Sequence, residues 1–271
     1  MVGWEVVVLV WSRGPRLLVQ AVFLLVFGVL VLAPFIVVAA AAFAGSWNGV
    51  LPSDPTTTHL SEALSGDELA SIAVSPETAF LGGLLAVVFG TWGALAARSA
   101  TPGLARLTDA LHHLPIAVPS VVVGLSLLVA FSRPPLLLNG TKWIVVIAHL
   151  VLMVAFTYGT VTAALQRTDA VYADVAASLG ASAARVLWQV RLPMLRPAIV
   201  SAAGLSVALS MGEVGATIMV YPASWRTVPV GVFALTDRGQ TFTAAAESLV
   251  LLVVTVVLVV GLDRLRGKAT S

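Results

Sequence analysis

Apolar segments of about twenty residues constrain this sequence most, because they are too long and too poor in charge for a soluble core. Six such segments are visible, at about residues 17–43, 78–97, 114–132, 143–165, 197–219 and 244–262. A helix of roughly 20 apolar residues crosses the hydrocarbon core of a bilayer and satisfies its own backbone hydrogen bonds. Only 10% of the residues are charged, whereas soluble domains carry about 25%. The sequence therefore predicts an all-α membrane protein with six transmembrane helices.

Basic residues predict how these helices are oriented, since Lys and Arg accumulate in cytoplasmic loops. An N-terminus in the cytoplasm places eleven basic residues inside and four outside. The predicted external segment 44–77 contains five acidic residues and no Lys or Arg. We therefore expect a multi-pass protein of the bacterial cytoplasmic (inner) membrane, with both termini cytoplasmic. The net charge of +2 then reflects topology, and no nucleic-acid partner is expected.

Several kinds of chemistry are excluded or disfavoured by composition. The chain has no cysteine, which excludes disulfides, thiolate metal sites and cysteine nucleophiles. His112 and His113 are adjacent but have no clustered carboxylates, and His59 and His149 are isolated. Two adjacent histidines do not build a metal site by themselves. We expect no metal and no cofactor in this chain.

Small residues recur at every fourth position of the second apolar segment. These residues are Gly82, Ala86, Gly90 and Ala94. Such a stripe allows another helix to approach closely, and we expect packing within the chain rather than contact with a second subunit. Ser75 and Pro76, just before the segment, predict the start of this helix, because Ser is a frequent cap and Pro a frequent first residue.

Prolines mark the start of the third segment, "LPIAVPSVVVG". Pro115 and Pro119 should start or kink the helix there. Irregular backbone at membrane depth is tolerated only where it is buried in protein or lines a wet cavity. We therefore expect Pro119 and the nearby Gly124 to line a translocation pathway.

Glu213, in "SMGEVGAT", is the only carboxylate that we expect deep within a span. An ionisable group there usually faces the interior of a bundle or a wet cavity. Gly212 and Gly215 flank it and favour a local break in the helix. Two interpretations stay open: Glu213 and its flanking glycines line the pathway, or Glu213 is a structural acid bonded to a neighbouring helix.

A charged, helix-patterned stretch separates the fourth and fifth apolar segments: "DVAASLGASAARVLWQVRLP", residues 174–193. Val175 and Leu179 share one helical face, and Gly180 is suited to a left-handed stop. Ser182 can cap a second helix that carries an apolar stripe. The pattern predicts two short helices joined at an angle, which either lie on their own bundle as an interfacial amphipathic helix or present apolar surface to a partner.

The spacing of this stretch resembles the EAA loop of ABC importer permeases: EAA, three residues, Gly, nine residues, then I-x-L-P. Residues 174–176 stand at the EAA positions with Asp for Glu and Val for the first Ala, Gly180 matches the glycine, and residues 190–193 supply the ending. The family's loop docks into the ATPase subunit. The residues to which the resemblance assigns this coupling role are Asp174, Val175, Ala176, Ala177, Ser178, Leu179, Gly180, Ala181, Leu192 and Pro193.

The resemblance implies the type I ABC importer permease fold, with a cytoplasmic coupling helix between helices four and five. The predicted organisation is an N-terminal helix and external loop over 1–75, a permease core over 76–262 with the coupling loop at 166–196, and a cytoplasmic tail over 263–271. It also implies an ATPase subunit dimer, a second permease subunit, identical or related, and an external solute-binding protein as partners, in contact with membrane lipid. No G-x-x-x-x-G-K-[ST] motif is present, so we expect ATP and Mg²⁺ on the ATPase subunits.

Longer runs resemble one group of these permeases, which serves sulfate, molybdate, ferric iron, thiamine and phosphonates. "LPIAVPSVVVGL", "PLLLNGTKWIV" and "MGEVGATIMVYPASWRTVPVGVFALTDRG" are most similar to the 2-aminoethylphosphonate permeases, so a phosphonate is the expected solute and the other solutes of the group are alternatives. An intramembrane enzyme that uses Glu213 is a rival, which needs a second catalytic group such as Glu247 nearby. A secondary transporter is another, although no inverted repeat is detectable.

Overall fold

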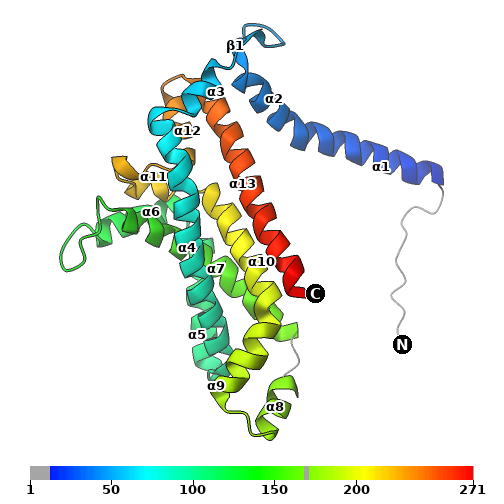
Figure 1. Ribbon diagram of the computed structural model, residues 1–271, viewed down its shortest axis with the longest axis vertical. Helices are drawn as coiled ribbons and strands as arrows, with labels where there is room; N and C mark the ends of the chain where they lie inside the picture. The colour runs from blue at the N-terminus through cyan, green and yellow to red at the C-terminus, as the bar shows by residue number, and fades with distance from the viewer. Residues whose placement is uncertain (1–12, 168–170, 271) are drawn as a thin grey trace.

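A computed structural model describes residues 13–167 and 171–270. The predicted cytoplasmic N-terminus, residues 168–170 of the predicted coupling loop, and Ser271 lie outside the described residues. The described chain forms an elongated bundle of helices, with one helical arm leaving it near the end that carries β1 (Figure 1). This arrangement agrees with the predicted helical membrane protein.

The elements follow one another in this order: α1 (Arg13–Phe27), a π-helical turn η1 (Gly28–Leu32), α2 (Ala33–Ala42), β1 (Ala44–Ser46), β2 (Ser53–Pro55), α3 (Thr58–Ala63), α4 (Gly66–Ser99), α5 (Pro102–Ala117), α6 (Ser120–Ala130), α7 (Lys142–Arg167), α8 (Val171–Ser178), α9 (Ala183–Val186), a π-helical turn η2 (Leu187–Arg191), α10 (Leu192–Met211), α11 (Thr217–Val220), a 3₁₀ turn η3 (Ala223–Trp225), α12 (Val228–Asp237) and α13 (Thr241–Thr270). The strands pair as a short antiparallel hairpin, so the chain is mostly rather than entirely helical. The predicted tail, as far as Thr270, continues α13.

Among the described residues, 5 helices are long and apolar enough to cross a membrane. They cover Gly14–Ala42, Gly66–Ser99, Lys142–Arg167, Ala183–Met211 and Thr241–Arg264. A sixth span is reached only if α5 and α6, which meet at 107°, count as one broken span. Five of the six predicted segments therefore correspond to long helices.

The third predicted span, at about 114–132, corresponds to two helices, α5 and α6, rather than to one long helix. α5 already begins at Pro102 and contains Pro115, and the break falls at Val118 and Pro119. Val118 has an extended ψ angle of 131°, because proline disfavours the helical conformation of the residue before it, and Pro119 itself has a ψ angle of 136°. The predicted kink at Pro119 is confirmed, whereas a helix start at Pro115 is not.

The predicted start of the second span at Ser75 and Pro76 is also wrong. α4 begins at Gly66 and crosses the predicted boundary between residues 75 and 76, with Pro76 inside the helix. The Ser75 hydroxyl accepts a hydrogen bond from the backbone N–H of Val228, at 2.7 Å. A tertiary contact with α12, rather than a helix cap, therefore uses this serine.

The small-residue stripe of α4 packs against α7, as the intramolecular interpretation predicts. All four of its residues are buried. A Cβ at Gly82 would lie 2.6 Å from the Cβ of His149, and one at Gly90 would lie 2.9 Å from the backbone nitrogen of Tyr158. The two helices thus approach to a distance that only glycine permits at these positions.

Gly90→Ala is expected to destabilise the protein, because the added methyl meets α7 backbone that cannot move alone. Overpacking of this kind costs about 1–3 kcal/mol, or roughly 2–4 °C of melting temperature per kcal/mol in a chain of this size. Thermal unfolding of the detergent-solubilised protein measures the effect. Gly204→Ala is the matched control, since no atom lies within 4 Å of a Cβ there, and equal melting temperatures for the two variants would contradict the close α4–α7 packing.

The arm formed by α1, η1 and α2 extends away from the bundle (Figure 1). Ala41 and Ala42 at its inner end pack with Ala63 and with Ala245 and Ala246 of α13. Apart from Arg13, Arg16 and Gln20, the outward part is apolar, and its leucines and phenylalanines are exposed. A membrane interior or another membrane subunit is the environment in which such an arm is stable.

Candidate coupling and pathway sites

The predicted coupling stretch occupies the end of the bundle farthest from β1 (Figure 1). α8 ends in a left-handed glycine, with φ +84° at Gly180. The N–H of Gly180 bonds to the carbonyl of Ala177 at 2.9 Å, and that of Ala181 bonds to the carbonyl of Ala176 at 3.0 Å. These two bonds form a Schellman motif, so Gly180 ends the helix as predicted.

The chain then turns into α9, and Ser182 accepts a hydrogen bond from the N–H of Arg185 at 3.3 Å. The predicted cap is confirmed. The predicted second short helix is wrong, because α9, η2 and α10 form one helix over Ala183–Met211. We call α8, the turn and α9, residues 171–186, the elbow. Leu192 and Pro193 lie at the start of α10, beyond the elbow, whereas the other proposed coupling residues belong to α8 and the turn.

The elbow exposes apolar side chains at its tip. Leu179 is 84% exposed and Val175 is exposed by more than half, as is Trp188 in the adjoining turn η2. Only Ala173 of α8 is buried. Exposed apolar residues gathered on one element mark a contact surface, which supports the partner interpretation of this stretch over an amphipathic helix lying on its own bundle.

A break separates α10 from α11, and Gly212, Glu213 and Gly215 lie in it. α10 ends at Met211 and α11 begins at Thr217, so the predicted local break is confirmed. The carboxylate of Glu213 is half-buried and accepts a hydrogen bond from the backbone N–H of Ala216, at 2.6 Å between Oε1 and N. Glu213 therefore caps the start of α11 through a local bond, which differs from the bond to a neighbouring helix in the structural interpretation, and its pathway role stays a prediction.

α6 packs directly on this break. A Cβ at Gly124 would lie 2.5 Å from the carbonyl oxygen of Ala216, and a Cβ at Gly215 would overlap the Ser120 hydroxyl. The predicted pathway residues Pro119, Gly124 and Gly215, together with Glu213, thus meet where two interrupted helices cross, and Gly212 lies exposed beside them. In the chain alone, Pro119 and Gly212 are exposed, and Val118, Glu213 and Gly215 are partly buried.

His149, which we expected to be isolated, is a buried hydrogen-bonding residue behind the break. Its Nδ1 lies 2.5 Å from the Ser210 hydroxyl of α10, and its Nε2 lies 2.9 Å from the Thr217 hydroxyl of α11. It thereby joins α7 to both sides of the break. The sequence signal was a polar residue within each of three apolar segments, since such groups need partners at membrane depth.

The match to known families identifies the chain. The profile described as the binding-protein-dependent transport system inner membrane component matches residues 86–268. The chain belongs to this family. The matched range contains the elbow, the break and α6, and so covers both candidate sites of the permease.

Relatives and a solved structure agree with this family. A protein of Salmonella paratyphi A, named as a candidate 2-aminoethylphosphonate transport system permease (PhnV), is 43% identical over 96% of this chain and 98% of its own length. The molybdenum transport system permease ModB of Mycobacterium tuberculosis is 32% identical over 70% of this chain and 77% of its own. A bacterial ABC transporter that imports alginate shares the fold, with a TM-score of 0.71 at 16% identity over 95% of this chain and 97% of that one.

Glu247 does not supply the permease with a partner for Glu213. It lies in α13, fully buried, and its carboxylate faces α12, where a Cβ at Gly231 would be 2.7 Å from Oε1. The charged groups that act on it are Arg226 and Glu68, which form an ion pair at 3.1 Å. Neither Glu247 oxygen has a hydrogen-bond partner among the described residues. The intramembrane-enzyme rival requires two acids that act as a pair. Glu213 and Glu247 instead lie on different elements and have different neighbours.

No group of three His, Cys, Asp or Glu side chains within residues 13–167 and 171–270 lies close enough together to hold a metal ion. The polar side chains at the break are the Glu213 carboxylate, the His149 imidazole and the hydroxyls of Ser120, Ser210 and Thr217. His149 is buried and bonds to the buried Ser210 and Thr217, whereas Glu213 is only partly buried.

Proposed function

We propose that this permease component passes a phosphonate, with 2-aminoethylphosphonate as the best candidate, from an external binding protein into the cytoplasm. The observation that carries the proposal is the 43% identity to PhnV along almost the whole of both chains. Molybdate remains the alternative favoured by a specific relative, ModB, and sulfate, ferric iron and thiamine remain in the wider group. Each of these solutes is small and polar, as the break at Glu213 would require.

ATP hydrolysis is proposed to occur on a separate pair of ATPase subunits that bind the elbow. An elbow of fixed shape can transmit a movement of the ATPase subunits to the membrane helices. The Schellman motif at Gly180 fixes the angle, and the exposed Leu179 provides the contact. This proposal places the elbow and both chain termini in the cytoplasm, as the basic residues predict.

A second permease subunit, identical or related, is proposed to complete the pathway across the break. The exposed apolar surfaces of the arm and of α6 would then be covered by this subunit and by membrane lipid. An external solute-binding protein would deliver the solute at the end that carries β1 and α12. One solved structure of the alginate transporter is a complex with a periplasmic protein that holds an alginate pentasaccharide, which supports a partner of this kind.

Uptake in a deletion strain tests the proposed solute. The strain lacks its own uptake systems for phosphonates and molybdate and expresses this chain together with an ATPase subunit, a second permease subunit and a solute-binding protein. We expect uptake of 2-aminoethylphosphonate in excess of molybdate and sulfate. Uptake of molybdate alone would favour molybdate as the solute. In a separate test, purification of the chain without any ATPase partner would contradict the proposal of an ABC importer and favour an enzyme or a secondary transporter.

Glu213→Gln tests whether the carboxylate serves the pathway in addition to capping α11. The amide oxygen can still accept the Ala216 N–H bond, so assembly should be retained while uptake falls if the charge contacts solute. Glu213→Ala removes the cap, which leaves the N–H unpaired at a cost of about 1–3 kcal/mol, and should lower the yield of complex. Transport per assembled complex is the measurement, and unchanged transport in both variants would eliminate the pathway role.

A further inference from the structure

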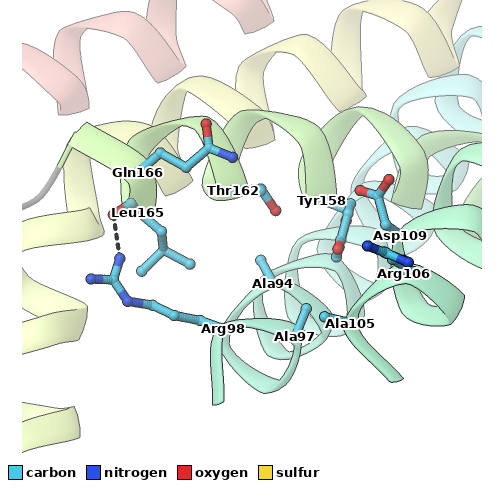
Figure 2. A pocket seen from close by; sticks show the side chains of 10 residues that line it. All are labelled: Ala94, Ala97, Arg98, Ala105, Arg106, Asp109, Tyr158, Thr162, Leu165 and Gln166. Atoms are coloured by element: carbon cyan, nitrogen blue, oxygen red, sulfur yellow. Dashed lines mark hydrogen bonds between the residues drawn. The ribbon is translucent and has the colours of Figure 1, made fainter. Parts of the chain in front are cut away.

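A cavity of about 410 Å³ opens between the ends of α4 and α7, with α5 lying across them (Figure 2). Pockets that bind small ligands usually measure about 300–1,000 Å³. The cavity shares no lining residue with the contact between α6 and the break. It is therefore separate from the proposed pathway site, and its side chains are not explained by that function.

Two arginines line this cavity. Arg98, at the end of α4, donates a hydrogen bond to the carbonyl of Leu165 near the end of α7, and Figure 2 shows other nitrogens of the guanidinium directed away from that bond. Arg106, on α5, forms no ion pair among the described residues. The planar guanidinium matches the geometry of phosphate oxygens, which it binds through two parallel N–H bonds. This part of the cavity is suited to a phosphate or phosphonate group.

A carboxylate lies beside the second arginine. Figure 2 shows Asp109 next to Arg106 and Tyr158, and the Asp109 carboxylate lies 3.4 Å from Nδ1 of His113 and is largely exposed. It would repel a simple anion and attract an ammonium group. The Tyr158 ring that forms the wall is fixed by stacking on His112, with 4.3 Å between ring centroids.

The hydroxyl group of Thr162 completes the lining of the cavity. The Thr162 oxygen is buried and has no hydrogen-bond partner within normal geometry among the described residues, although the Tyr158 phenol lies near it. Alanines of α4 and α5 form the rest of the wall. The cavity thus offers cationic groups, an anionic group and the hydroxyls of Tyr158 and Thr162 within one small volume.

We propose that this cavity binds a zwitterion in which an ammonium group and a phosphate or phosphonate are separated by a short carbon chain. Arg98 and Arg106 take the acidic group, and Asp109 takes the ammonium. Two sources carry this chemistry: the headgroup of phosphatidylethanolamine, and free 2-aminoethylphosphonate. Basic pockets between membrane helices on the cytoplasmic side bind anionic headgroups such as that of cardiolipin, and Asp109 is the feature here that favours a headgroup with an ammonium group. The inference rests on the proposed orientation of the chain but not on the proposed solute.

Lipid retention and solute binding by the assembled transporter test the inference. The complex is placed in nanodiscs of phosphatidylcholine that contain equal small amounts of phosphatidylethanolamine and phosphatidylglycerol, and native mass spectrometry reports which lipid is retained. Equilibrium dialysis of 2-aminoethylphosphonate and of inorganic phosphate against discs of phosphatidylcholine alone tests the free source. The variants are Arg106→Gln and Asp109→Asn, and Arg264→Gln is the control for loss of one basic residue elsewhere.

The wild-type complex should retain phosphatidylethanolamine over the other two lipids, or bind 2-aminoethylphosphonate over phosphate, and these two results identify the source. Arg106→Gln should weaken whichever binding is found by about tenfold, the effect of losing one charge-assisted hydrogen bond, and Arg264→Gln should not. Asp109→Asn should remove the preference for the zwitterion. Equal retention in the Arg106 and Arg264 variants, or a preference unchanged by Asp109→Asn, would overturn the proposal. If 2-aminoethylphosphonate is not taken up but phosphatidylethanolamine is still retained, the result contradicts the proposed solute and not the proposed cavity.

Discussion

Leu179→Asp is expected to abolish solute-stimulated ATP hydrolysis and uptake while the chain still inserts and folds. The side chain is 84% exposed in the chain alone, so the substitution should cost the isolated subunit little. Against an ATPase, the same position loses the burial of a leucine, worth about 1.5–3 kcal/mol. It also forces a carboxylate into an apolar contact, which costs more. The effect therefore appears only when the partner is present.

Reconstituted transporter with its binding protein and solute provides the measurement, and Leu51→Asp is the matched control. Leu51 is 78% exposed but lies between β1 and β2, at the opposite end of the bundle. Gly180→Pro should reproduce the loss, because proline fixes φ near −65° and cannot adopt the +84° observed. Full ATPase stimulation in the Leu179 variant would show that the elbow does not couple the subunits.

Local signals predicted the elbow well because its geometry depends on neighbouring residues. A left-handed glycine and a serine cap act within one turn of the chain, and both Gly180 and Ser182 adopt the predicted roles. The length of the following helix was missed because Pro193, which usually interrupts a helix, lies inside the helix Ala183–Met211, directly after the π-helical turn η2. The partner that docks on the elbow cannot be predicted from the local sequence.

Tertiary contacts account for what sequence patterns could not predict. The break at Gly212 was visible, but its partner α6 was not, because the contact depends on a 107° bend that brings Gly124 onto Ala216. His149 and Glu247 were judged by their sequence neighbours. Their true neighbours come from other helices: Ser210 and Thr217 for His149, and Gly231 of α12 for Glu247.

Gly124→Ala should have the largest effect on the proposed pathway, because the two interrupted helices touch at Gly124 and the added methyl group would force them apart. Its Cβ would lie 2.5 Å from the oxygen and 2.8 Å from the Cα of Ala216, and backbone atoms on both sides must move apart. Overpacking costs about 1–3 kcal/mol. If the α6–α11 contact persists in only one of two transport conformations, that cost shifts their equilibrium by about 5–150-fold.

Gly204→Ala is the matched control for this substitution. It lies within α10, where no atom is within 4 Å of its Cβ, so it adds a methyl group without forcing the helices apart. We expect transport per assembled complex to fall at least about tenfold in Gly124→Ala, equivalent to about 1.4 kcal/mol, and to change little in Gly204→Ala. Assembly is measured in parallel by size-exclusion chromatography. Normal transport in assembled Gly124→Ala would mean that α6 and α11 need no close contact, and the break would then be a structural interruption rather than part of the pathway.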